Sequence, residues 1–271
     1  MPPVHRVALL MVVVTLSATF AGAHDFWLVP DAFRIAANSE VVVRGQTSSA
    51  FPTTLSAVTP DRVTEARLVG AADDERITAL STRDNSLVLR HRPKTSGQKV
   101  VAVAVGWRSV NETAAGFRKY LVGEGAEAAL KHYDRTGQLP TADIVRRYAK
   151  YGKTLVEVGD GPRAFDRVIG HPLEFIPLSD PNAAIVGSGL RMRLMFLGQP
   201  LAGARLHAGL APSAGKKTPE VSLTTSADGV VSVPVDAAGL WNVRTIHVVP
   251  SPSGAGANWD VHWATLVYSV K

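Results

Sequence analysis

The sequence predicts a mainly β protein built from two β-sandwich modules, with a helical insertion in the first module. Three observations carry this prediction: short β-branched runs separated by turn residues, a change to helix formers near residue 111, and a return of strand rhythm after residue 152. The predicted division places the first module at residues 24–175, with its helical segment at about 111–152, and the second at 176–271. Strands of this length and spacing are typical of immunoglobulin-like sandwiches.

The N-terminus has the pattern of a secretory signal peptide, residues 1–23. Residues 5–6 supply a short basic start, residues 7–14 are an unbroken apolar run, and Ala21 and Ala23 form a small-residue cleavage site. The apolar run is well short of the roughly 20 residues that span a bilayer. The sequence therefore predicts a periplasmic protein that has no membrane span after processing.

Cleavage after Ala23 makes His24 the first residue of the mature chain. A terminal histidine carries an α-amine and an imidazole, and the two can chelate one metal ion through a six-membered ring. The pKa of an α-amine is about 7.7–8.0, so a metal ion can displace its proton near neutral pH. Cleavage after Gly22 or His24 would remove this chelate, and the alternative is that cleavage merely falls before a histidine. Asp25 is a further candidate ligand.

The composition limits the partners and the kinds of metal ligand that the protein can have. Removal of 23 residues from 271 leaves 248, with 28 basic residues (29 minus Arg6) and 23 acidic residues. The basic residues are scattered along an exported chain, which disfavours nucleic acid as a partner. There is no cysteine, so any transition metal must be bound through histidine, carboxylate or the free amine. Nickel, cobalt, copper and zinc all suit such ligands.

Strands are expected throughout the first module until the helical segment. They are predicted at residues 26–29, 40–44, 63–68, 77–80, 86–92 and 99–107. Helices are then predicted at residues 117–121, 126–134 and 142–150. Gly123 and Gly125 separate the first two. Thr141 is a suitable N-cap for the third, and Asp143 lies in its first turn, where the helix dipole favours a carboxylate.

The remaining strands contain the other candidate ligands. His171 and Glu174 are three residues apart, so strand alternation places them on opposite faces and favours a structural or turn role for His171 over a ligand role. In residues 240–249 His247 shares a face with Trp241, and a buried imidazole there needs a hydrogen-bond or metal partner. A satisfied structural histidine is the alternative for His247.

In the last predicted strand, residues 259–270, the apolar residues shift from odd to even positions. Trp259 and Trp263 occupy odd positions, while Leu266 and Tyr268 occupy even ones. This change predicts a β-bulge near residues 264–265. His262 lies opposite the tryptophans, where a solvent-facing position is one interpretation.

Several segments together resemble the DUF4198 family of exported bacterial proteins, also described as a NikM-like nickel or cobalt uptake family. They are residues 24–28, 148–156, 170–181, 198–204 and 238–241. The resemblance implies a periplasmic location, β-sandwich modules of which the second is similar to carboxypeptidase regulatory-like domains, and a link to nickel or cobalt transport. Since no further membrane span is present, it implies an accessory protein and not a membrane subunit.

The leading hypothesis is a soluble periplasmic protein that binds a divalent transition metal and delivers it to a membrane metal-uptake transporter. His24 would anchor the ion, His247 would converge on it as the third ligand, and His171 and Asp25 are further candidates. One alternative is a histidine-brace copper oxidoreductase, and another is an interaction module without metal. A bound metal does not itself identify a reaction, and the chain has neither a nucleophile elbow nor a phosphate-binding glycine loop.

Overall fold

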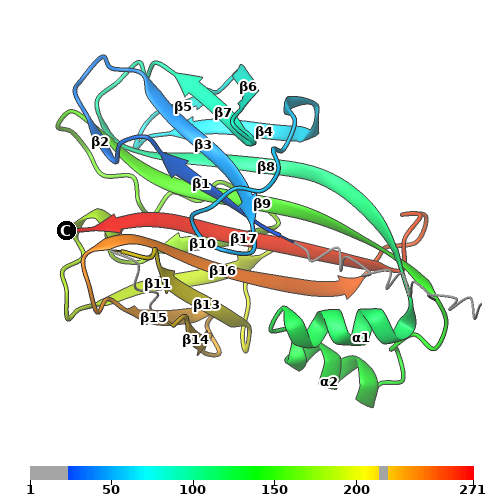
Figure 1. Cartoon of the computed structure of the whole chain (residues 1–271). Helices are drawn as coiled ribbons and strands as arrows, with labels where there is room; N and C mark the ends of the chain where they lie inside the picture. The colour runs from blue at the N-terminus through cyan, green and yellow to red at the C-terminus, as the bar shows by residue number, and fades with distance from the viewer. Residues whose placement is uncertain (1–23, 214–218) are drawn as a thin grey trace, which may run out of the picture.

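Three β-sheets and two short helices make up the fold in the computed structural model, which describes residues 24–213 and 219–271 (Figure 1). The predicted mainly β class is confirmed. Each of the six strands predicted in the first module overlaps an observed strand. The predicted signal peptide, residues 1–23, lies outside the described residues.

The largest sheet forms the central layer. Its strands follow the order β14-β13-β16-β17-β9-β8-β4-β5, with β2 beside β9. Their bounds are β2 Arg34–Ile35, β4 Val63–Val69, β5 Asp74–Arg76, β8 Gly97–Glu112, β9 Ile144–Val158, β13 Arg205–Leu210, β14 Val221–Thr224, β16 Gly239–Pro250 and β17 Trp259–Val270. The pairings of β9 with β17 and with β2 are parallel, and the others are antiparallel.

Two smaller sheets pack against the central one. One has the order β1-β3-β7-β6, from Asp25–Pro30, Val41–Ser48, Ser86–His91 and Ala79–Arg83. The other joins β10 (Leu173–Pro177), β11 (Gly189–Phe196), β12 (Gln199–Pro200) and β15 (Val230–Pro234). In β8, Val101 and Val103 belong to the core beneath the first small sheet, while Val100 and Ala102 belong to the core beneath the second. Since neighbouring side chains leave opposite faces, the small sheets cover opposite faces and build two sandwiches on one shared layer.

The shared layer combines strands from both predicted modules. β9, from the first predicted module, pairs along Trp259–Val267 with β17 from the second. β8 pairs with the other edge of β9. The sandwich packing is as predicted, and the division at residues 175/176 stays a prediction.

Two of the three predicted helices are confirmed. They are α1 (Ala114–Gly123) and α2 (Glu127–Arg135), which lie side by side at one end of the central sheet (Figure 1). The Thr113 side chain caps α1 by accepting a 3.0 Å hydrogen bond from the Gly116 amide. Phe117 and Tyr133 pack their rings 5.1 and 4.6 Å from that of Trp259. In the described part of the chain, no helix is long and apolar enough to cross a membrane.

The predicted helix at residues 142–150 is wrong. This stretch begins β9, so the helical part of the predicted 111–152 segment ends with α2. β9 lies inside the sheet, with hydrogen-bonded neighbours on both sides. Ile144 and Val145 are β-branched, which suits a strand, and pairing on both edges outweighs the weak signal of Thr141 and Asp143.

Gly125 connects the two helices in a conformation that favours glycine. Its φ is +77°, and a Cβ there would lie 2.6 Å from Nε2 of His207. We expect Gly125→Ala to lower the free energy of unfolding by about 1–2 kcal/mol because an L side chain is strained in the left-handed region. Gly123→Ala is the control: no atom lies within 4 Å of its added Cβ, and alanine favours the helix by about 1 kcal/mol. Urea unfolding measures both, and equal effects would contradict this account of the turn.

Candidate functional site

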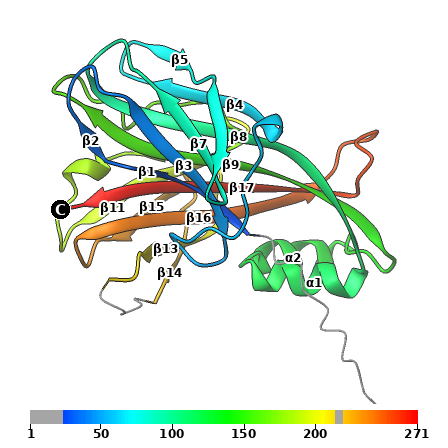
Figure 2. The same ribbon diagram turned by 45° about the horizontal axis from the view of Figure 1, so that its top comes forward.

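The first described residues are held against the central sheet. The Thr265 hydroxyl of β17 donates a 2.5 Å hydrogen bond to the Phe26 carbonyl. The Lys150 ammonium of β9 donates to the His24 carbonyl. β1 consequently begins at a fixed position, next to the two helices (Figure 2).

His24 has a side-chain nitrogen that makes no hydrogen bond within the described part of the chain. Its side chain is partly buried, and Nδ1 is buried without a hydrogen-bond partner in the described part of the chain. Burial lowers the pKa of this imidazole, and the neighbouring Lys150 ammonium lowers it further. A neutral imidazole is the form that binds a metal ion.

Asp25 is almost fully buried, with 5% of its surface exposed. Its Oδ2 lies 3.5 Å from Nε of Arg244 on β16, while Oδ1 has no hydrogen-bond partner among the described residues. Burial raises the pKa of Asp25 to about 6, although the charges of Arg244 and Lys150 oppose this. Burial and the charge of Asp25 raise the pKa of Glu124, just after α1, to about 7. Asp25 and Glu124 are therefore carboxyl groups that ionise less readily than usual.

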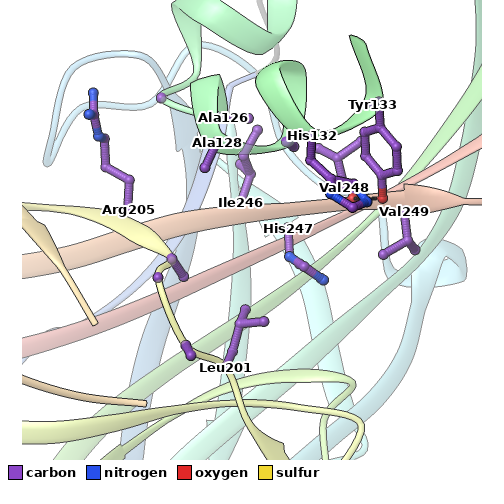
Figure 3. A pocket seen from close by; sticks show the side chains of 15 residues that line it. Ala126, Ala128, His132, Tyr133, Leu201, Arg205, Ile246, His247, Val248 and Val249 are labelled. Carbon is purple, nitrogen blue, oxygen red and sulfur yellow. Dashed lines mark hydrogen bonds between the residues drawn. The ribbon is translucent and has the colours of Figure 1, made fainter. Parts of the chain in front are cut away.

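His247 lies on the opposite face of the central sheet from this site. It is three residues beyond Arg244, the partner of Asp25, so the two side chains leave β16 on opposite faces. Figure 3 shows His247 leaving the strand on the side away from His132 and Tyr133 of α2. The predicted convergence of His24 and His247 on one ion is therefore wrong, because separation by the sheet excludes a shared ligand sphere.

His247 instead belongs to a row of rings between the central sheet and the sheet of β11. His262 is its cross-strand partner. The Phe196 ring lies 4.3 Å from the His247 ring and 5.1 Å from that of His262. Burial lowers the pKa of both histidines to about 4. Both imidazoles are therefore neutral at pH 7.

His171 lies farther along the same row. It is 5% exposed, its ring centroid is 5.4 Å from that of Tyr151, and the Tyr151 hydroxyl is 3.2 Å from Nδ1 of His262. Nε2 of His171 is 3.2 Å from Oε1 of Glu65, and its Nδ1 has no partner among the described residues. Tyr151 thus stands between His171 and His262. Within residues 24–213 and 219–271, no three His, Asp or Glu side chains are arranged to hold a metal ion.

Sequence reasoning missed the burial of His262. It does lie opposite the tryptophans, as predicted, but only 6% of its surface is exposed. The predicted β-bulge is also wrong, since β17 pairs with β16 and β9 without a register shift. The apolar residues Leu266 and Tyr268 share the parity of His262 and were the available signal: both faces of this strand are core.

The sequence matches the family model described as "Domain of unknown function (DUF4198)" over residues 21–249. The chain belongs to the DUF4198 family. The match includes His24, Asp25, His171 and His247, and no curated protein matches the chain.

Solved structures share only a distant similarity with this DUF4198 protein. Trypsin-activated alpha-2-macroglobulin from Escherichia coli is 10% identical, with a TM-score of 0.26; the alignment covers 91% of this chain and 16% of that one. The Yersinia pseudotuberculosis adhesin InvE is 12% identical, with a TM-score of 0.20 and coverage of 91% and 60%. This chain therefore spans less than two thirds of either protein, and TM-scores this low carry no argument about its function.

Proposed function

We propose that this DUF4198 protein is an exported periplasmic protein that binds a divalent transition metal at His24. One observation supports the proposal most: His24 Nδ1 and Asp25 Oδ1 are buried ligand atoms without hydrogen-bond partners in the described chain, and they belong to the first two residues of the predicted mature protein. Imidazole, amine and carboxylate together suit nickel, cobalt and copper. As the NikM-like description implies, the ion would be handed to a membrane uptake transporter.

The residues around His24 would supply distinct parts of the site. The α-amine and Nδ1 of His24 form the chelate. Burial raises the pKa of Asp25 to about 6 and that of Glu124 to about 7, and a dication beside these carboxyl groups would offset the cost of their ionisation. The positive charges of Arg244 and Lys150 repel the ion. Binding also requires that the ion displace the proton of the α-amine.

A histidine-brace oxidoreductase is less well supported by this geometry. A brace needs a second imidazole at the same ion. His247 is on the other face of the sheet, and among the described residues that line the cleft beside His24 there is no other histidine. The proposal therefore contains no catalytic step.

Metal titration of the mature chain tests this function. We expect His24→Ala to weaken binding of nickel, cobalt or copper by about 100-fold, which corresponds to about 2.7 kcal/mol, because it removes the imidazole of the chelate. Asp25→Asn should weaken binding less, through loss of charge. Isothermal titration calorimetry of metal-free protein measures both.

Two further variants serve as controls in the same titration. His247→Ala and His132→Ala should leave the affinity unchanged, since His247 lies across the sheet and His132 is exposed on α2. If no metal binds, or if His24→Ala binds as tightly as the unaltered chain, the proposal fails. Intact mass of the exported protein verifies that the chain begins at His24.

A further inference from the structure

A cleft of about 460 Å³ opens beside His24. Four cationic side chains line it: Arg62 from the 3₁₀ turn Pro60–Arg62, Arg108 from β8, and Arg146 and Lys150 from β9. None of the lining residues in the described chain is acidic. The cleft therefore concentrates positive charge on several walls.

The internal contacts of these cations leave donors available. Arg62 donates one 3.1 Å hydrogen bond, from Nη2 to the Gly106 carbonyl. Arg146 is only 3% exposed: its Nε pairs with Glu112, its guanidinium lies 4.0 Å from the centre of the Tyr120 ring, and its Nη1 has no partner among the described residues. A buried donor without a partner costs about 1–3 kcal/mol.

A second polar atom at this cleft also has no partner. Thr47 is 7% exposed, and its Oγ1 has no hydrogen-bond partner in the described chain. Thr47 lines the cleft with Arg146. Two buried polar atoms without partners at one basic cleft indicate that a polar ligand completes their hydrogen bonds.

We propose that this cleft binds a small organic polycarboxylate. Arginine side chains match planar carboxylates with paired hydrogen bonds, and cations on different walls require a ligand with more than one anionic group. Val58, Val110 and Tyr148 also line the cleft, which favours a carbon skeleton over inorganic phosphate. The inference goes beyond the proposed metal site and applies to metal-free protein. An anion here would also reduce the repulsion between these cations and an ion at His24.

Calorimetric titration of the mature, metal-free protein with citrate tests this proposal. The metal is removed on a chelating resin, because soluble chelators are themselves polycarboxylates. We expect a Kd below about 1 mM. Arg108→Gln, at an exposed position, should weaken binding about tenfold by removing a charge-assisted contact. Arg191→Gln changes an exposed arginine on β11 and should have no effect.

Thr47→Val separates binding from folding. It replaces a buried hydroxyl without a partner by a methyl group of similar size, so the ligand-free protein should be at least as stable while citrate binds more weakly. Acetate and inorganic phosphate are the comparison ligands, and both should bind more weakly than citrate. Tighter binding of phosphate, equal loss in Arg108→Gln and Arg191→Gln, or no citrate binding at 10 mM (about ten times the expected Kd) would each overturn the proposal.

Discussion

Replacing Glu174 by glutamine is expected to lower the free energy of unfolding by about 3–5 kcal/mol, because the change leaves the Lys153 ammonium buried without a countercharge. Both residues are 2% exposed, and Nζ of Lys153 is 2.7 Å from Oε1 of Glu174. The same carboxylate accepts hydrogen bonds from the amides of Ile169 (2.7 Å) and Gly170 (3.0 Å). Burial lowers the pKa of Lys153, and the charge of Glu174 opposes that shift.

Urea unfolding of Glu174→Gln measures this loss. The matched control is Glu40→Gln, which removes a partner of Arg90 from an exposed ion pair with 2.7 Å between Nη1 and Oε2. An exposed pair contributes about 0.2–1 kcal/mol, so the control should change little. Equal losses in the two variants would contradict the role assigned to the buried pair, which joins β9 to β10 and hence the central sheet to the β10–β11 sheet.

Acid is expected to destabilise the metal-free protein because the imidazoles of His247 and His262 are buried in the row of rings between the central sheet and the sheet of β11. Burial lowers the pKa of His247 and of His262 from 6.5 to about 4. In the unfolded chain both protonate near pH 6.5, so the stability they contribute is fully present above pH 6.5 and is lost as the pH falls toward 4. A shift of this size corresponds to about 3 kcal/mol for each histidine.

The variant His262→Gln isolates this contribution. Asp25 and Glu124 act in the opposite direction: their raised pKa values give stability that is present at low pH and lost as pH rises through about 6 and 7. The variant retains both carboxyl groups, so its stability should fall by about 2.5 kcal/mol less than that of the unaltered chain between pH 7.5 and 4.5. The exposed His132→Gln should follow the unaltered chain. Superimposable profiles for all three proteins would contradict the assignment.

Local patterns were sufficient for much of the fold. The β-branched runs predicted the strands of the first module, and Gly123 and Gly125 separated two helices that the structure contains. The alternation of apolar residues in β16 correctly placed Trp241 on a face that belongs to a core. These features depend on side-chain period and turn chemistry, which a single sequence records directly.

Pairings between distant segments were not predictable in this way. β9 lies beside β17, about 110 residues away along the chain, for example at Lys150 and Trp263. That pairing converts a predicted helix into a strand and buries both faces of β17. The prediction for His247 failed for the same reason: a strand parity shows which residues share a face, but it does not show which face β1 covers. The predicted cleavage site pointed to His24 and Asp25 as candidate ligands, whereas Arg62, Arg108 and Arg146 of the basic cleft come from separate elements.

The central claim is that the free terminus of His24 holds a metal ion, and one comparison tests it most directly. The mature chain beginning at His24 is titrated with nickel, cobalt and copper beside the same chain carrying an acetyl group on the His24 α-amine. Acetylation keeps every side chain and converts only the basic α-amine into an amide. We expect a loss of affinity of about 100-fold for the acetylated chain, with protons of the α-amine released on binding only to the free terminus. Equal affinities for the two proteins would contradict it.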